Sequence, residues 1–179
     1  MSVKDFNLEQ FIADARQAAV SENPILSAES LMKATVADCE NIIANMPVIE
    51  ECERMLFEDD TVSIWYCRFE PGTVVPAHDH QMHVVVGVYQ GAEEHAFFDN
   101  SNGEYKEIKS LSLGATEVAK LSPNQIHTVT ATNTASQALH IYLGKLSTVE
   151  RSLFTFDSGK EIPFSVENYE KLAQVNSLT

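Results

Sequence analysis

Residues 72–91 read GTVVPAHDHQMHVVVGVYQG, and this stretch decides the fold and the site that we predict. Within it, His78 and His80 are separated by a single residue. On a β-strand, side chains two positions apart lie on the same face, so both imidazoles can project into the interior of a barrel. Two neutral imidazoles side by side make a poor apolar core, but they form half of a metal site. We therefore predict that His78 and His80 bind one metal ion.

The sequence around this segment alternates short β-forming runs with turns. β-Branched and aromatic residues dominate the runs, and Gly, Pro, Asn and Ser separate them. Many short strands at near-regular spacing indicate a sandwich or a barrel. The strands that we predict span residues 62–69, 84–89, 96–98, 105–111, 117–121, 127–132 and 138–142.

Helical patterns lie before and after the strands. Apolar residues recur at helical spacing over residues 5–20, and a second amphipathic pattern ends near Met46. We expect these helices to pack on the outside of the barrel, and a last helix at 165–173. No repeat or linker interrupts the chain, so we predict a single domain over residues 1–179. Its parts are a helical segment at 1–50, a β-barrel at 54–145 and a C-terminal extension at 146–179.

The overall charge narrows the classes of partner. The 179 residues include 26 acidic and 12 basic side chains, for a formal net charge of -14. Such a surface repels nucleic-acid phosphates and anionic lipids, so we expect neither nucleic acid nor a membrane as a partner. The segment up to Asp14 lacks the apolar run of a secretory signal, and the longest apolar run, Val84–Tyr89, is too short to span a bilayer.

Cysteine usage favours a reducing compartment. The chain has three cysteines, and none belongs to a Cys-x-x-Cys pair. A disulfide framework or a zinc ribbon is therefore not expected, and we predict reduced thiols in a cytoplasmic protein. The three residues are Cys39, Cys52 and Cys67.

The spacing around the histidine pair resembles the first motif of the cupin superfamily. Five residues separate Gly72 from His78, and a further glycine closes the following strand. Residues 114–127, with a glycine, a proline turn and His127, are similar to the second cupin motif, although the proline stands one residue nearer the histidine and the usual asparagine is displaced. The resemblance covers residues 54–151. It implies a mainly β fold, a double-stranded β-helix, in which His127 is the third metal ligand.

The ligand set departs from that of many cupins, which add a glutamate a few residues after the histidine pair. Residues 81–85 read QMHVV here, so no carboxylate is available at those positions. The predicted site is therefore three neutral histidines, which leave open coordination positions for other ligands. We expect His83, at odd spacing from His80, to point to the opposite face, and His95 to be a solvated strand residue.

Three-histidine cupins without the glutamate resemble thiol dioxygenases, the cysteine dioxygenase family and its bacterial relatives. The resemblance implies that Fe(II) and O2 convert a small thiol, cysteine or a mercapto-acid, to its sulfinic acid. The string His140-Ile141-Tyr142 is similar to that family's His-x-Tyr, in which the tyrosine faces the iron and the histidine supports it. The family usually has a serine two residues before this histidine, and here the residue is Ala138.

Two arginines are candidates for holding the carboxylate of the thiol, because guanidinium binds carboxylate through two hydrogen bonds. Arg54 lies where animal cysteine dioxygenases carry such an arginine, and Arg151 lies where mercaptopropionate dioxygenases carry theirs. Each could instead be a surface ion pair in this acidic protein, and His140 and Tyr142 could be a buried polar pair at a strand end.

The sequence leaves other functions and other metals open. A cupin that binds a metal or a small ligand without turnover, or a cupin dioxygenase or isomerase of a carbon substrate, would use the same fold. Three histidines also suit Zn, Ni, Mn and Cu. A homodimer is a further interpretation that the sequence leaves open.

Overall fold

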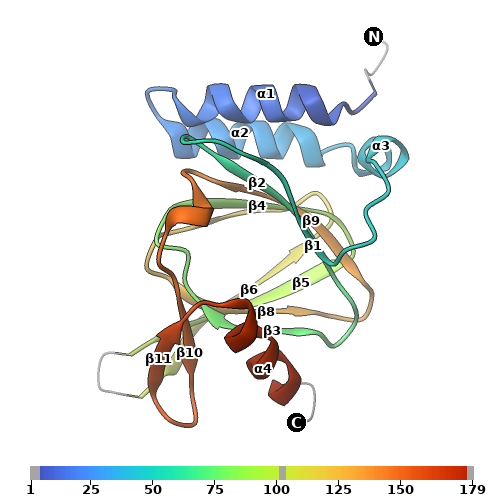
Figure 1. Cartoon of the computed structure of the whole chain (residues 1–179). Coiled ribbons are helices and arrows are strands. Elements are labelled where there is room, and N and C mark those ends of the chain that lie inside the picture. The colour runs from blue at the N-terminus through green and yellow to red at the C-terminus, as the bar shows by residue number, and fades with distance from the viewer. Residues whose placement is uncertain (1–4, 101–103, 177–179) are drawn as a thin grey trace.

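The computed structural model describes residues 5–100 and 104–176, and its first part is helical. Helices α1 (Leu8–Ala19), α2 (Pro24–Val36) and α3 (Cys39–Asn45) lie together over one side of the strands (Figure 1). The second predicted helix is thus divided in two. The reason is Asp38, whose carboxylate accepts a hydrogen bond from the backbone N–H of Asn41 (3.2 Å) and caps a new helix start.

The described strands form two antiparallel sheets. In the first, the order is β1-β2-β9-β4-β7, and in the second it is β11-β10-β3-β8-β5-β6. The first sheet comprises β1 (Glu53–Glu58), β2 (Ser63–Phe69), β9 (Ser136–Tyr142), β4 (Val84–Gln90) and β7 (Val118–Leu121). The second comprises β11 (Lys160–Pro163), β10 (Ser152–Thr155), β3 (Val74–His78), β8 (Ile126–Ala131), β5 (Ala92–Asp99) and β6 (Lys106–Gly114).

The path of the chain through the two sheets identifies the architecture. From β2 to β5 each strand lies in the opposite sheet from the one before it, and so do those from β6 to β9. The central strands consequently stand in the orders 2-9-4-7 and 3-8-5-6. This is the arrangement of a double-sheet jelly roll, or double-stranded β-helix. The mainly β barrel with N-terminal helices that the sequence predicts is confirmed.

The helical layer packs closely on the first sheet. Met32 and Val36 of α2 are fully buried, and they face Gly87 in the middle of β4. A Cβ atom built on Gly87 would lie 2.4 Å from Cγ of Met32 and 2.9 Å from Cγ1 of Val36. Glycine at this position therefore lets the helix approach the strand. No helix in the described ranges is long and apolar enough to cross a membrane.

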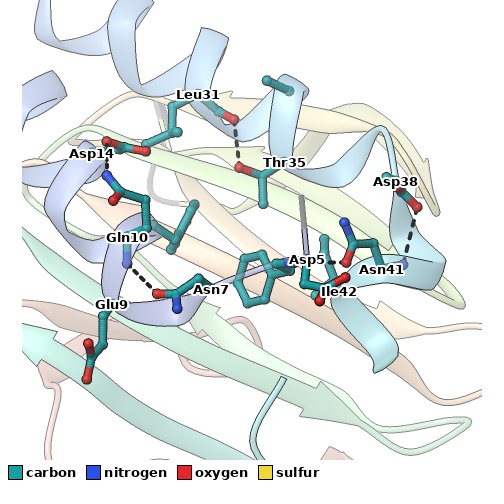
Figure 2. A pocket seen from close by; sticks show the side chains of 13 residues that line it. Asp5, Asn7, Glu9, Gln10, Asp14, Leu31, Thr35, Asp38, Asn41 and Ile42 are labelled. Atoms are coloured by element: carbon teal, nitrogen blue, oxygen red, sulfur yellow. Dashed lines mark hydrogen bonds between the residues drawn. The ribbon is translucent and has the colours of Figure 1, made fainter. Parts of the chain in front are cut away.

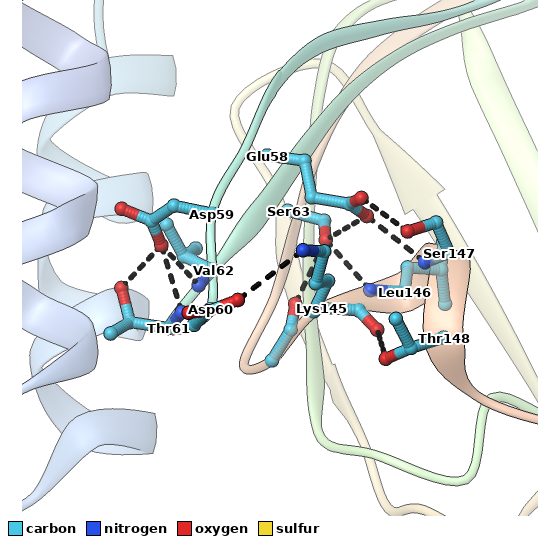
Figure 3. Close-up of polar contacts among 11 residues, drawn as sticks. Glu58, Asp59, Asp60, Thr61, Val62, Ser63, Lys145, Leu146, Ser147 and Thr148 are labelled. Carbon is cyan, nitrogen blue, oxygen red and sulfur yellow. Dashed lines mark hydrogen bonds and ion pairs between the residues drawn. The ribbon is translucent and has the colours of Figure 1, made fainter.

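A polar network fixes the chain just after β9 (Figure 3). The backbone N–H of Leu146 donates to Oγ of Ser63 (2.9 Å), and the N–H of Ser147 donates to Glu58 (3.0 Å). Lys145 forms an ion pair with Asp60 (3.3 Å). These contacts hold the 3-10 helix η1 (Leu146–Thr148) against the start of β2 and so direct the chain toward Arg151.

The C-terminal segment contains more structure than the sequence patterns predict. Strands β10 and β11 form a hairpin, and β10 joins the second sheet through Leu153, which pairs with His78. Helix α4 (Val166–Asn176) follows, and its Tyr169 packs against the apolar cluster that contains Phe69 and Val75. Figure 1 shows the hairpin and α4 at the end of the barrel remote from α1 and α2.

Candidate metal centre

Three histidines come together inside the barrel. His78 ends β3, His127 lies near the start of β8, and the two residues are register partners across the second sheet. His80 joins them from the loop after β3. One ring nitrogen of each residue lies within 4.8 Å of the others, and all three side chains are buried. This group could hold a metal ion.

The local structure around His80 differs from the prediction that both histidines lie on one strand. Strand β3 ends at His78, and the chain turns at Gln81, whose φ is 54°. The side-chain amide of Gln81 donates to Asp79, and Asp79 accepts a hydrogen bond from the N–H of Ser152 (2.9 Å). Asp79 thus ties the loop to β10, and the loop brings His80 back toward His78.

The nitrogens of the first two histidines fit a metal. Nδ1 of His78 lies 2.8 Å from the carbonyl oxygen of Pro76, which can only accept, so Nδ1 carries the proton and Nε2 keeps a lone pair. Nε2 of His80 lies 3.2 Å from that nitrogen. Two imidazole nitrogens each about 2.0–2.1 Å from one Zn²⁺-sized ion would have a similar separation. His78 and His80 therefore suit a shared metal.

The third histidine also has an orphaned nitrogen. Nε2 of His127 is buried and has no hydrogen-bond partner among the described residues, and the same holds for Nδ1 of His80. A buried polar atom without a partner costs about 1–3 kcal/mol, which a bound metal would offset at His127. The donor set of three imidazoles fits a divalent first-row metal.

Burial keeps the cluster uncharged. Desolvation lowers the pKa of His78 to about 4, and it lowers the pKa of His80 and of His127 well below the usual value. The positive charge of Arg151 acts in the same direction on His78 and His80. Neutral imidazoles are the form that binds metal, so the site is ready for a metal at neutral pH.

His95 corrects the prediction of a solvated strand residue, because its side chain is fully buried. Its ring stacks on that of His127, with centroids 5.4 Å apart and planes at 15°. Nδ1 of His95 lies 3.3 Å from Nδ1 of His127, and Nε2 lies 3.2 Å from the buried Glu93. Alternation along β5 places Glu93 and His95 on one face, and this is the signal in the sequence that points to the pair.

Tyr142 and His140 stand beside the cluster from the opposite sheet. The ring of Tyr142 lies 5.5 Å from that of His80, centroid to centroid, and its hydroxyl lies 3.2 Å from Nδ1 of His140. Burial raises the pKa of Tyr142 well above its usual value and lowers that of His140 to about 4. At neutral pH the pair is a phenol and a neutral imidazole. Nε2 of His140 has no partner among the described residues.

Arg151 lies directly before β10 and is close to the histidine cluster through Phe164. Its guanidinium carbon stands 3.9 Å from the centre of the Phe164 ring, and that ring lies 6.0 Å from the ring of His78. Arg151, Phe164 and Gln81 line a pocket of about 720 Å3 together with Glu150 and Glu161, and none of the three clustered histidines lines it. Arg151 forms no ion pair within 4.0 Å in the described parts of the chain, but the charges of Asp79 and Glu53 act on it. Burial lowers its pKa from the usual value, but a guanidinium remains charged.

Arg54 is not brought to this site. It lies on the exposed edge strand β1, and its guanidinium forms an ion pair with Glu51 (3.4 Å). The surface ion pair that the sequence left open is therefore what the structure shows for Arg54. His83 is exposed on the outer side of the barrel, as its spacing predicts. All three cysteines are free thiols.

A second concavity lies away from the histidines. It is a groove of about 700 Å3 between α1, α2 and α3, and Figure 2 shows the acidic residues Asp5, Glu9, Asp14 and Asp38 around it. Part of its polar lining is satisfied within the groove, since Asn7 caps α1 and Gln10 donates to Asp14 (2.9 Å). The groove holds no group of metal-binding geometry among the described residues.

Comparison with known proteins gives similarities of fold at low sequence identity. No family model matches the chain. Similar solved structures include a cupin superfamily protein from Desulfitobacterium hafniense DCB-2, with 18% identity, a TM-score of 0.45, and 60% of this chain and 87% of that one covered. An RmlC-like cupin family protein from Methanocaldococcus jannaschii has 10% identity, a TM-score of 0.48, and coverage of 57% and 88%.

An enzyme also appears among the similar structures. A recombinant oxalate oxidase in complex with glycolate has 17% identity and a TM-score of 0.43, with 54% of this chain and 53% of that one covered. A shared fold does not by itself specify an activity, so function must be argued from the site.

Proposed function

We propose that this protein is a cupin-type, Fe(II)-dependent thiol dioxygenase that converts a small thiol bearing a carboxylate to its sulfinic acid. The observation that carries the proposal is that three neutral histidines, a phenol and an arginine with no ion pair among the described residues lie near one another. Each has a role in such a reaction, and a passive metal site would need only the histidines.

The ligand set leaves room for two reactants. His78, His80 and His127 would hold the metal, and no carboxylate stands among them. Fe(II) bound there would supply coordination positions for both a thiolate and O2 and the electrons that activate O2. In the overall reaction R–SH takes up both atoms of O2 to give R–SO2H, so no further reductant is required.

The protein's own groups bind and orient the substrate. Arg151, stacked on Phe164 in the pocket beside His78, would hold the carboxylate of the thiol through paired hydrogen bonds. Tyr142 would donate a hydrogen bond from its hydroxyl to an oxygen or sulfur atom of the reacting group. Nδ1 of His140, 3.2 Å from the hydroxyl oxygen, would then donate to that oxygen and orient the hydroxyl. Burial of the cluster excludes bulk water.

The test is O2 uptake by anaerobically Fe(II)-loaded protein, offered cysteine, 3-mercaptopropionate and cysteamine in turn. We expect stoichiometric conversion of a carboxylated thiol to its sulfinic acid, detected by mass spectrometry, and no turnover in the His78→Ala variant. Cysteamine has no carboxylate for Arg151 and should be the poorest of the three. Stoichiometric iron binding without uptake for any thiol would overturn the proposal and favour a binding protein or an enzyme of a carbon substrate.

A further inference from the structure

Two buried polar residues lie behind the metal cluster and outside it. The side chains of Glu93 and His95 on β5 are fully buried. Glu93 accepts a hydrogen bond at Oε1 from the hydroxyl of Ser136 on β9 (2.9 Å), and its Oε2 lies 3.2 Å from Nε2 of His95. Burying a carboxylate and an imidazole costs free energy unless they are hydrogen-bonded, and here each has a hydrogen-bond partner.

The direction of the hydrogen bonds follows from what each atom can do. The Glu93 carboxylate, which already accepts from Ser136, can only accept, so Nε2 of His95 carries a proton. In the tautomer protonated on Nε2, His95 has a lone pair on Nδ1, 3.3 Å from Nδ1 of His127. One of these two nitrogens must donate, and only that of His127 can. His127 is thereby protonated on Nδ1, and its lone pair stands on Nε2.

We propose that Glu93 and His95 are positioning residues that hold His127 in the tautomer with the Nε2 lone pair available to the metal. The inference rests on the metal site of the proposed function. Nε2 of His127 is the buried nitrogen that lacks a partner, as a ligand atom would without its metal. His78 achieves the same tautomer through the carbonyl of Pro76. A partner of this kind on the second ring nitrogen fixes a metal-binding histidine and raises its basicity.

Two variants separate this role from simple packing. His95→Phe keeps an aromatic ring that can stack on His127 but removes the acceptor, whereas His95→Asn places an amide oxygen near the position of Nδ1 and gives up the ring. If the hydrogen bond matters, His95→Asn keeps the metal affinity of the wild type and His95→Phe weakens it. If only the stacked ring matters, the order is reversed. Glu93→Gln tests the carboxylate. The glutamine amide can donate to Nε2 of His95, and the directions of the hydrogen bonds from residue 93 through His95 to His127 can then reverse.

The first readout needs no metal and no variant. Long-range 15N–1H spectra of the metal-free wild-type protein distinguish the two tautomers of each neutral histidine. We expect His127 to be protonated on Nδ1 and His95 on Nε2. The second readout is the Fe(II) dissociation constant, measured anaerobically against a competing chelator. We expect a rise of about 10- to 100-fold for His95→Phe and for Glu93→Gln, and a change of no more than about threefold for His95→Asn.

Tyr89→Phe is the matched control, because it removes another buried hydrogen bond of the barrel, from Tyr89 to Gln137 (2.9 Å), away from the cluster. It should leave the dissociation constant unchanged. Protonation of wild-type His127 on Nε2, or wild-type affinity in His95→Phe, would overturn the inference. Neither readout involves turnover, so a failure to oxidise thiols would count against the proposed function and leave this inference standing.

Discussion

The hydroxyl of Tyr142 remains protonated through the neutral pH range, because burial raises its pKa well above the usual value. Nδ1 of His140 lies 3.2 Å from the hydroxyl oxygen. When that nitrogen carries a proton and donates it to the oxygen, the hydroxyl keeps its own proton for another acceptor. At the scale of single residues, the three clustered histidines, His140 and Tyr142 are thus neutral, and Arg151 beside them is a cation.

Replacing Tyr142 with phenylalanine should separate catalysis from metal binding. The Tyr142→Phe variant keeps the ring and loses the donor, so we expect kcat for thiol oxidation to fall about 100-fold or more. The Fe(II) dissociation constant should stay within about twofold, because the hydroxyl is not among the three ligands. Steady-state O2 uptake and an iron titration measure the two quantities. Equal kcat in variant and wild type would exclude a role for the hydroxyl.

Arg151 and Arg54 form a matched pair of arginine variants. Arg151→Met keeps an aliphatic stem against Phe164 and loses the charge, so we expect KM for 3-mercaptopropionate to rise about 10- to 100-fold. Oxidation of cysteamine should be little affected. Arg54→Met, which removes only an exposed ion pair with Glu51, should match the wild type on every thiol. A similar loss for all three thiols in Arg151→Met would point to a structural defect and not to carboxylate binding.

At the scale of elements, helix α2 depends on the absence of a side chain in β4. Gly87→Ala would place a methyl group 2.4 Å from Met32 and 2.9 Å from Val36. Overpacking of this kind costs about 1–3 kcal/mol of unfolding free energy, and we expect a loss in that range in urea titrations. Met32→Ala by itself also destabilises the core, but the double variant should lose less unfolding free energy than the two single variants added together. If the double variant were no better than the sum of the singles, the close approach would not be the cause.

The β1–β2 turn gives a prediction about pH. The hydroxyl and N–H of Thr61 hydrogen-bond Asp59, and with Arg16 they lower its pKa to about 2 from 3.8 (Figure 3). Because the folded-state pKa is depressed, the stabilisation is complete above about pH 4 and is lost as the pH falls through about 2. Asp59→Asn should therefore cost about 1 kcal/mol at pH 7, allowing for solvent screening, and progressively less below pH 4. A pH-independent difference in urea midpoints would contradict this.

Strand periodicity was enough to predict the barrel, and the spacing of His78 and His80 was enough to predict half of a metal site, because both depend on local patterns. The third histidine, His127, followed only from the resemblance to the cupin motifs. Long-range geometry was not accessible in this way. His80 reaches the cluster from a loop shaped by Gln81, and the order of β10 and β11 comes from pairing with a distant strand. Arg54 and Arg151 are equally good candidates for carboxylate binding from the sequence. The folded chain shows that Arg151 lines the pocket and that Arg54 pairs with Glu51 on the surface.

The burial of Glu93 and His95 on β5 could not be predicted from the sequence for a different reason. Alternation places Glu93 and His95 on one face, but an isolated Glu-x-His is equally typical of a solvated strand. Their partners, Ser136 and His127, come from strands that are distant in sequence. The order of strands in the second sheet, with β5 next to β8, determines which face of β5 is buried.

At the scale of the whole molecule, the net charge of -14 dominates the surface. Self-repulsion among exposed carboxylates destabilises the compact state, and salt screens it over about 10 Å at 0.1 M. We expect the thermal midpoint of the metal-free protein to rise by a few degrees between about 20 mM and 500 mM NaCl. Scanning calorimetry measures it. A fall with added salt would mean that the surface ion pairs outweigh the repulsion.

The two sheets divide the site between them. Strands β3 and β8 of the second sheet carry His78 and His127, with His95 behind them, whereas β9 of the first sheet carries His140 and Tyr142. In evolutionary terms, substitutions of the β9 pair and of the three histidines fall on different sheets, although the hydrogen bond from Ser136 to Glu93 links the two. A descendant that lost His140 and Tyr142 would keep the three histidines that could hold a metal ion. One that kept β9 and exchanged the histidines would keep a phenol and an imidazole in contact beside an altered set of ligands.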